Sequence, residues 1–112
     1  MEKLNIRVFR QIFADEVGRL KEVEVISRKS YLGFSLFSHT EEGSLKYTVS
    51  EYQTGFRAGE DYNEEDAWAE AKYYIKTIGK AGVKKKIKEA LAKYGYANPV
   101  PSPQPETPAQ IS

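Results

Sequence analysis

The chain has 112 residues, of which 29% are charged and 12% aromatic, and its formal net charge is +1. It contains no cysteine, which excludes disulfide frameworks, thiolate metal sites and cysteine nucleophiles. No apolar stretch has the length of a signal peptide or a membrane span, so we expect a cytoplasmic protein that does not bind membranes.

The first element has two interpretations. Leu4, Ile6 and Val8 alternate with polar residues, as in a strand. A longer set of apolar residues follows the three- and four-residue spacing of one helical face: Ile6, Phe9, Phe13, Val17 and Leu20. We favour a helix near residues 4–17 and keep the strand as the alternative.

A small antiparallel sheet of three or four strands is expected next, because short segments rich in β-branched and aromatic residues alternate with turn residues. These strands are predicted at residues 22–27, 31–37, 45–52 and 56–58. Arg28–Ser30 is short enough to form the first hairpin turn, and residues 39–43 form the second. The single histidine, His39, falls in that second turn, where it is interpreted as an ordinary loop residue.

Two helices are predicted after the sheet. Asn63 is a good N-cap residue, and three acidic residues follow it, where negative charge suits the positive end of a helix. The apolar face up to Ile78 and the face after Gly82 are offset by roughly 120° at ideal helix geometry, so the chain must break between them. We expect helices near 64–78 and 82–94, both packed on one face of the sheet, in an α+β fold.

The C-terminal segment has a different composition from the rest of the chain. All five prolines lie within residues 97–112. Such a segment buries too little apolar surface to offset the entropy of ordering it. We therefore predict one globular domain over residues 1–95 and a disordered, proline-rich tail over residues 96–112.

No pattern predicts a catalytic centre, a cofactor or a metal site. His39 has no partner residues at the spacing that a catalytic or metal site requires. Residues 61–66, "DYNEED", partly follow a calcium loop, but Asp66 stands at the glycine position and Lys72 at the position of the bidentate glutamate. We expect a protein that is not an enzyme.

The two signs of charge are separated along the chain. Residues 31–71 contain two basic and nine acidic residues, whereas residues 72–95 contain eight basic and one acidic residue. The predicted basic surface consists of Lys72, Lys76, Lys80, Lys84, Lys85, Lys86, Lys88 and Lys93. The predicted acidic surface consists of Glu60, Asp61, Glu64, Glu65 and Asp66. Such segregation favours a polar surface that binds a macromolecule.

Two resemblances bear on the partner. "IGKAGV", residues 78–83, resembles a helix-hairpin-helix element, whose glycine turn grips a phosphate; that family separates its two glycines by one residue, and here two lie between them. "YTVSEYQTGFRAGEDYNEEDAWAEA", residues 47–71, resembles small accessory proteins of phages and other mobile elements. This second resemblance implies a small binding protein, including an inhibitor of a host defence component.

We therefore expect a non-catalytic binding protein with a protein partner. The alternative is a nucleic-acid-binding protein that uses the lysine-rich C-terminal helix to replace counterions on a phosphate backbone. The lysines also have an explanation that involves no partner, since lysines opposite an apolar stripe keep a helix solvated. The acidic residues beside the lysines favour the protein partner, because a nucleic acid gains nothing from them.

Overall fold

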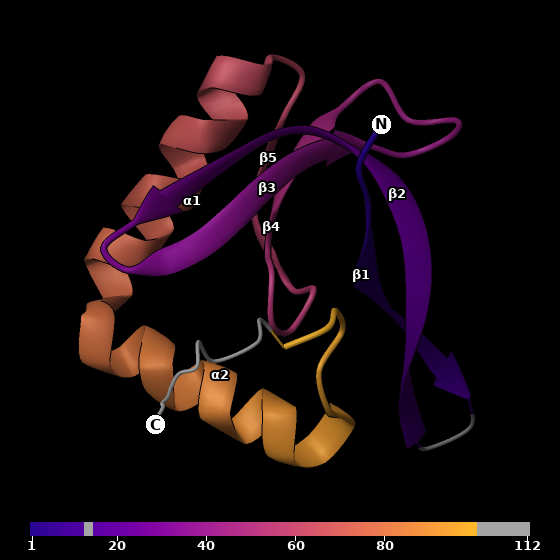
Figure 1. Cartoon of the computed structure of the whole chain (residues 1–112), viewed down its shortest axis with the longest axis vertical. Coiled ribbons are helices and arrows are strands. Elements are labelled where there is room, and N and C mark those ends of the chain that lie inside the picture. Colours follow the sequence, from indigo (N-terminus) through magenta and orange to yellow (C-terminus); the bar gives the residue numbers. More distant parts are fainter. Residues whose placement is uncertain (13–14, 101–112) are drawn as a thin grey trace, which may run out of the picture.

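The structure, a computed structural model, describes residues 1–12 and 15–100. In this part of the chain a five-stranded antiparallel sheet is followed by two helices (Figure 1). The strands lie side by side in the order in which they occur in the chain. The elements are β1 (Lys3–Ile12), β2 (Asp15–Tyr31), β3 (Phe34–Thr40), β4 (Tyr47–Glu51), β5 (Arg57–Asp61), α1 (Glu64–Ile78) and α2 (Lys80–Tyr94).

The helix predicted near residues 4–17 is wrong, and the described sheet has five strands rather than three or four. β1 pairs with β2 along its whole length. Leu4 and Ile6 are buried, whereas Val8 is exposed near the end of the hairpin. The two-residue period prevails over the helical spacing because β2, the other arm of the hairpin, pairs with the backbone groups that a helix would pair locally.

The first hairpin turn also differs from the prediction. Arg28–Ser30 continue β2, and the chain turns at Leu32 and Gly33, between the paired residues Tyr31 and Phe34. Both turn residues have positive φ, 51° and 87° respectively. Two successive residues in this region form the type of two-residue turn whose twist matches a hairpin, so Gly33 supplies the conformation and Leu32 tolerates it.

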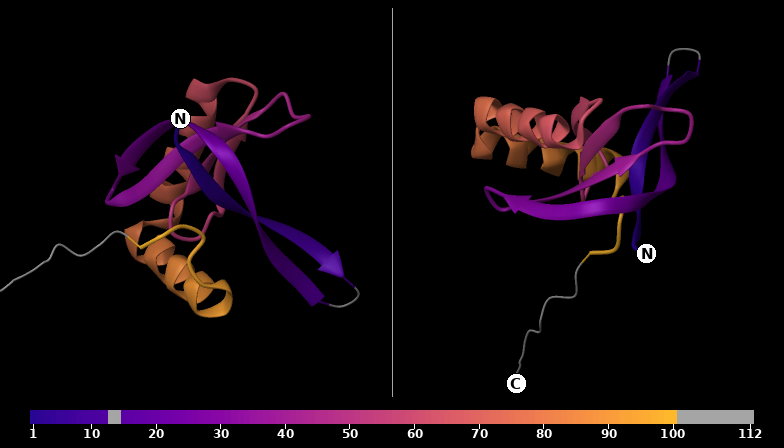
Figure 2. Two further views of the ribbon diagram at one scale, coloured as in Figure 1. Left: turned by 45° about the vertical axis from the view of Figure 1, so that its right-hand side comes forward. Right: turned by 90° about the horizontal axis from the view of Figure 1, so that it is seen from above.

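Apolar residues form one cluster on each face of the sheet, because successive residues of a strand point to opposite faces. Leu36 belongs to the helix-side cluster, with Phe34, Val49, Ala67, Trp68, Ala71, Ile75 and Val83. Phe37 belongs to the hairpin-side cluster, with Leu4, Ile6 and Val23. β2 has an irregular register between Val25 and Ser27. Figure 2 shows both helices on one side of the sheet, as predicted, and the outer part of the β1–β2 hairpin turned away from β3.

The helical region agrees closely with its prediction. Asn63 caps α1, with its side-chain oxygen accepting from the Asp66 backbone N–H at 3.2 Å. The predicted break between two helices is confirmed: Gly79 (φ 90°) separates them, and Gly82 lies inside α2. Gly95 follows α2 as its C-cap, also with positive φ. Glycine adopts these conformations without the strain that a side chain would impose.

The packed domain continues past the boundary predicted at residue 95. Ala97 and Asn98 are each only 3% exposed. The Asn98 side-chain oxygen accepts from the Asn5 backbone N–H at 2.7 Å, and its amide donates to the Asn5 carbonyl at 3.0 Å. This pairing covers part of the outer edge of β1. Residues 101–112 of the predicted tail lie outside the described residues.

Candidate functional site

All eight lysines of the predicted basic surface are exposed. Lys72 and Lys76 lie on α1, and the other six lie on α2. Among the described residues, none of the eight lies within ion-pair distance of an acidic group. Their charges are therefore available to a partner.

The lysines of α2 form two rows rather than one surface. Lys86 and Lys93 line a hollow on one flank of the helix, whereas Lys84 and Lys88 line a hollow on the other flank. Lys85 lines neither hollow. The division follows from helix geometry, because positions 86 and 93 lie two turns apart on one side of the stripe that faces the sheet.

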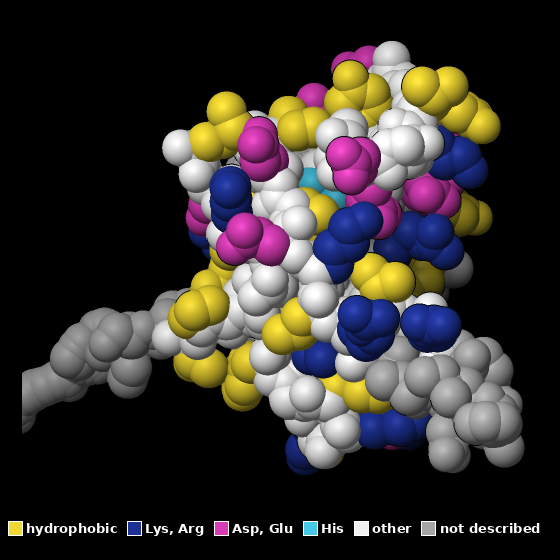
Figure 3. All heavy atoms as spheres, turned by 90° about the vertical axis from the view of Figure 1, so that its right-hand side faces the viewer, with side chains coloured by type: hydrophobic (Ala, Val, Ile, Leu, Met, Phe, Trp, Pro, Cys, Tyr) yellow, Lys and Arg dark blue, Asp and Glu magenta, His cyan; other side chains and the backbone are white. Residues whose placement is uncertain are grey.

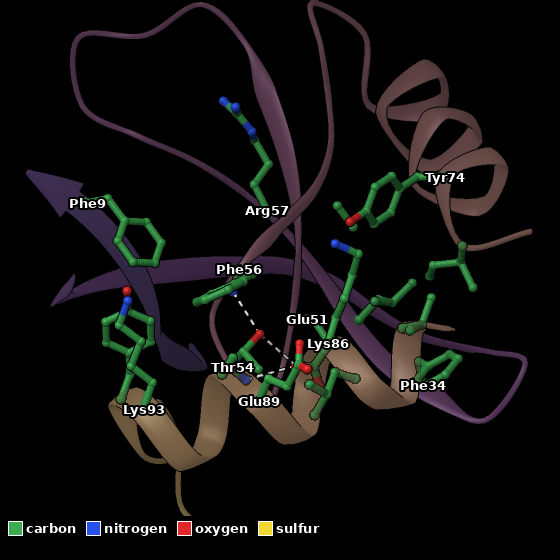
Figure 4. A pocket seen from close by; sticks show the side chains of 17 residues that line it. Phe9, Phe34, Glu51, Thr54, Phe56, Arg57, Tyr74, Lys86, Glu89 and Lys93 are labelled. Atoms are coloured by element: carbon green, nitrogen blue, oxygen red, sulfur yellow. Dashed lines mark hydrogen bonds between the residues drawn. The ribbon is translucent and has the colours of Figure 1, made fainter. Parts of the chain in front are cut away.

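The first hollow is a groove of about 430 Å³ between α2, the end of α1 and the sheet. We call it the aromatic groove, and six side chains from four elements and one turn characterise it: Phe9, Phe34, Phe56, Tyr74, Ile87 and Tyr94. Figure 4 shows Lys86 extending from α2 toward Tyr74, while Phe9 and Lys93 lie at the opposite end. A pocket of this size, with apolar walls and a few charged groups, is typical of a binding site.

Three aromatic rings form the Phe9 end of the groove. Phe9 meets Phe56 edge to face at a ring distance of 5.1 Å, and it meets Tyr94 at 5.3 Å. Arg7 secures this end of α2, because its guanidinium donates to the Gly95 carbonyl at 3.1 Å and lies 5.6 Å from the Tyr94 ring centre. Phe9 remains 37% exposed, so the cluster presents an aromatic face to solvent.

The carboxylate in the groove wall has a structural role. Glu51 is 7% exposed and accepts three hydrogen bonds: from the Gln53 backbone N–H at 2.7 Å, and from the backbone N–H and hydroxyl of Thr54, both at 2.8 Å. These bonds build the turn between β4 and β5. Their donors come from two residues of that turn, so Glu51 fixes the backbone there.

The second hollow, of about 700 Å³, lies on the other flank of α2. Arg28 lines it, but this residue is already engaged, with an ion pair to Glu2 at 2.7 Å and its guanidinium 4.9 Å from the Tyr52 ring centre. Ile87 lines both hollows. α2 therefore crosses the sheet with a depression on each side.

The predicted acidic residues have unequal roles. Glu60 pairs with Arg57 at 3.0 Å and with Lys46 at 3.8 Å, and an Asp61 carboxylate oxygen accepts from the Asn63 backbone N–H at 3.4 Å. Glu65 and Asp66 are exposed at the start of α1. Figure 3 shows the face of the β1–β2 hairpin, where Asp and Glu side chains gather in the upper part and Lys and Arg predominate below. Positive and negative side chains are thus unevenly distributed on this face.

Glu64 fastens α1 to the sheet rather than presenting charge to a partner. One carboxylate oxygen accepts from the hydroxyls of Ser38 (2.7 Å) and Ser27 (3.0 Å) and from the indole N–H of Trp68 (3.2 Å). The Ser38 hydrogen bond, ahead of the other two and of nearby Lys29, holds the pKa of Glu64 below its usual value, although partial burial opposes this. Sequence reasoning missed this role because both serines come from distant strands.

His39 lies in β3, so its interpretation as a loop residue is wrong. Its side chain is completely buried in the hairpin-side half of the sheet, with the ring centre 5.6 Å from that of Phe37 and Nε2 2.9 Å from the Ser50 hydroxyl. Burial lowers the pKa of His39, with Glu41 opposing the shift. Such a histidine is neutral near pH 7 and belongs to the interior.

No family model, curated protein or solved structure matches this chain. Neither described helix is long and apolar enough to cross a membrane. Within the described residues, no group of three or more histidine, aspartate or glutamate side chains is placed to hold a metal ion. The candidate site is thus defined by its own geometry: an apolar groove and the unpaired lysines around it.

Proposed function

We propose that this protein is a non-catalytic binding protein that engages another protein through α2 and the aromatic groove. The observation that carries the proposal is the combination of an open, apolar depression with unpaired lysines on the helix that borders it. Protein interfaces typically combine a buried apolar centre, rich in aromatic residues, with a polar rim.

Three ionisable groups with roles inside the fold support a binding role over a catalytic one. Glu51 and Glu64 each accept three hydrogen bonds from their own surroundings. His39 is completely buried on the hairpin side of the sheet, together with Phe37. The fold itself thus holds both carboxylates by hydrogen bonds, and His39 does not line the groove, which suits structural roles more than the proton transfer of a general acid–base mechanism.

A nucleic-acid partner is the second candidate, and the unpaired lysines are the observation that favours it. Six of them lie on one 15-residue helix whose first turn carries no acidic residue. The test is binding of single- and double-stranded DNA and RNA at 50 mM and 200 mM salt. Phosphate binding predicts steep weakening with salt and a further loss when Lys84, Lys85 and Lys86 are replaced by glutamine. Absence of binding at low salt would remove this candidate.

The resemblance of residues 47–71 to accessory proteins of phages and mobile elements suggests the kind of partner. A component of a host defence system, inhibited by occupation of its surface, would fit a small protein without catalytic groups. A cytoplasmic location is part of this proposal.

Site-specific crosslinking tests the protein partner directly. A photo-crosslinking amino acid replaces Lys85, which is exposed on α2, and in a matched control it replaces Leu45, which is 84% exposed in the β3–β4 loop. That loop and α2 lie at opposite ends of the molecule (Figure 1). In cells of the source organism we expect one dominant protein adduct from position 85 and none from position 45. Equal adducts from both positions, or none from either, would contradict the proposal.

A further inference from the structure

We infer that the aromatic groove binds an acidic peptide segment of the partner, which inserts an aromatic or aliphatic side chain between α2 and the sheet. This inference rests on the proposed function and names the chemistry that the groove recognises. It follows from three features of the groove: its apolar interior, the charge around that interior, and the spacing of the charge.

The interior of the groove offers contact to an apolar side chain. Phe9 is 37% exposed and Tyr74 is 40% exposed, and these rings come from opposite ends of the groove. Phe34, Phe56 and Ile87 line the space between them. An inserted side chain would remove these partly exposed surfaces from water, which is how anchor residues dominate the affinity of a protein interface.

The charge around the groove selects for acidic neighbours of that anchor. Lys86 and Lys93 line the groove on the α2 side and are unpaired among the described residues. Arg57 lines the opposite side but already pairs with Glu60. Glu89 is the one further acidic residue in the lining besides the hydrogen-bonded Glu51. Lys93 also lies 5.1 Å from the ring centre of Tyr94, but neither lysine is ion-paired among the described residues, so the two set the sign of the ligand.

The spacing of the two lysines constrains the peptide. Positions 86 and 93 are seven residues apart, which is about 10 Å along the axis of an α-helix. An extended peptide covers that distance in about three residues. We therefore expect acidic residues on both sides of the anchor, roughly three positions apart in an extended peptide.

The test is selection from a displayed random peptide library on the immobilised wild-type protein. The enriched peptides are then synthesised with a fluorescent label, and their affinities are measured by anisotropy. We expect enriched sequences to carry an aromatic or aliphatic residue flanked by aspartate or glutamate, and their binding to weaken as salt is raised. Binding of labelled dodecanoate is measured in parallel, as a small apolar anion.

Matched variants locate the binding site. Reversing both groove lysines, in K86E/K93E, should weaken peptide binding about tenfold or more, whereas K76E/K85E changes the same charge outside the groove and should change it less than about threefold. Removing the ring in F9A should weaken binding about tenfold, while the control L45A should have no effect. Removing the opposing charge in E89K should tighten binding about threefold.

The possible results separately test the groove, the peptide ligand and the cellular partner. Enrichment of peptides without acidic residues, or equal binding by wild type and K86E/K93E, would overturn the groove assignment while leaving a protein partner bound elsewhere. Binding of dodecanoate with no enrichment of peptides would overturn the peptide and replace it with a small anion. Failure of the crosslinking experiment together with successful peptide selection would refute the proposed cellular partner and leave the groove specificity supported.

Discussion

Helices α1 and α2 have the same length, 15 residues, but the rest of the molecule holds them in different ways. α1 buries four residues against β4 and β5, and Asn63 caps its first turn. α2 buries only Val83 and Ala90, and its N-cap residue, Gly79, provides no side-chain cap. Hollows flank α2 on both sides.

The two helices therefore have different roles in the domain. α1 is fixed by close packing and by hydrogen bonds from Glu64 to two strands, so its residues determine stability. α2 contributes fewer buried residues and presents its six lysines to solvent, which leaves them available for the binding role proposed above. Substitutions in or against α1 should therefore lower stability, and surface substitutions in α2 should not.

The largest loss of stability is expected from a substitution at Gly59, where β5 contacts α1. A Cβ atom at this position would lie 2.5 Å from the Ala67 carbonyl oxygen and 2.6 Å from the Ala71 nitrogen. Because these are backbone atoms, α1 would have to move, and G59A should lose about 3 kcal/mol of unfolding free energy in urea titrations.

The control is the same change in α2. An added Cβ at Gly82 meets only the Ile78 side chain, at 2.7 Å, and Gly82 lies inside a helix, where alanine is preferred. Because only the Ile78 side chain has to shift, and alanine suits a helix better than glycine, G82A should cost less than about 1 kcal/mol. A similar loss in G59A and G82A would show that the two helices are equally constrained.

The second effect is expected at Glu64. In E64A the hydroxyls of Ser27 and Ser38 and the indole N–H of Trp68 lose their common acceptor, which should lower the unfolding free energy by about 2 kcal/mol. Glu65 is exposed in the same helical turn, so E65A should cost about 0.5 kcal/mol through the helix dipole alone. Equal losses in the two variants would mean that the Glu64 contacts contribute nothing beyond charge.

Acid provides a reversible version of the same test. Because the folded-state pKa of Glu64 is lowered, its contribution is present in full above its ordinary pKa of 4.5 and is lost as the pH falls through the folded-state value. Below pH 4.5 the wild type should therefore lose stability with acid more steeply than E64Q, which cannot titrate. Parallel stability curves for the two proteins would contradict the assigned direction.

A smaller effect is expected at the cap of α1. N63A removes the acceptor for the Asp66 backbone N–H and should cost about 1 kcal/mol, whereas N63D retains an acceptor and should recover most of the loss. Thermal unfolding followed by circular dichroism would measure both. A loss in N63D equal to that in N63A would assign the effect to something other than capping.

The cap at Asn63 also shows which parts of the fold the sequence could predict. Asn63, the acidic first turn and the glycine at position 79 act within one or two helical turns, so their effects can be read from neighbouring residues. β1 could not be assigned in this way. Its apolar residues satisfy both a helical and a strand period, and pairing with β2 decides between them.

The candidate site was predictable only in part, because some of its features depend on contacts between distant parts of the chain. The exposure of the lysines follows from the apolar stripe opposite them, which the sequence displays. The aromatic groove does not follow from the sequence pattern. Phe9, Phe34 and Tyr94 come from three elements, and the distances between these elements depend on how α2 lies against the sheet. The burial of His39 was missed because β3 continues through residues 39 and 40, into the segment expected to turn.

The smallest effect on stability is expected from the two groove lysines, Lys86 and Lys93. Their double variant tests most directly whether α1 and α2 have different roles. Both side chains are exposed and unpaired among the described residues, so K86E/K93E should change the unfolding free energy by no more than about 0.5 kcal/mol. Most of that change should come from Lys93, since a cation in the last turn of a helix suits the dipole. Urea titration of the variant measures it.

This variant separates stability from binding, since the same change should weaken peptide binding at the aromatic groove about tenfold. G59A should behave in the opposite way, lowering stability while any folded fraction keeps its affinity for the peptide. If K86E/K93E instead destabilised the domain as strongly as G59A, the lysines would be holding α2 in place. The charge of α2 would then serve the fold, and the distinction between the two helices would fail.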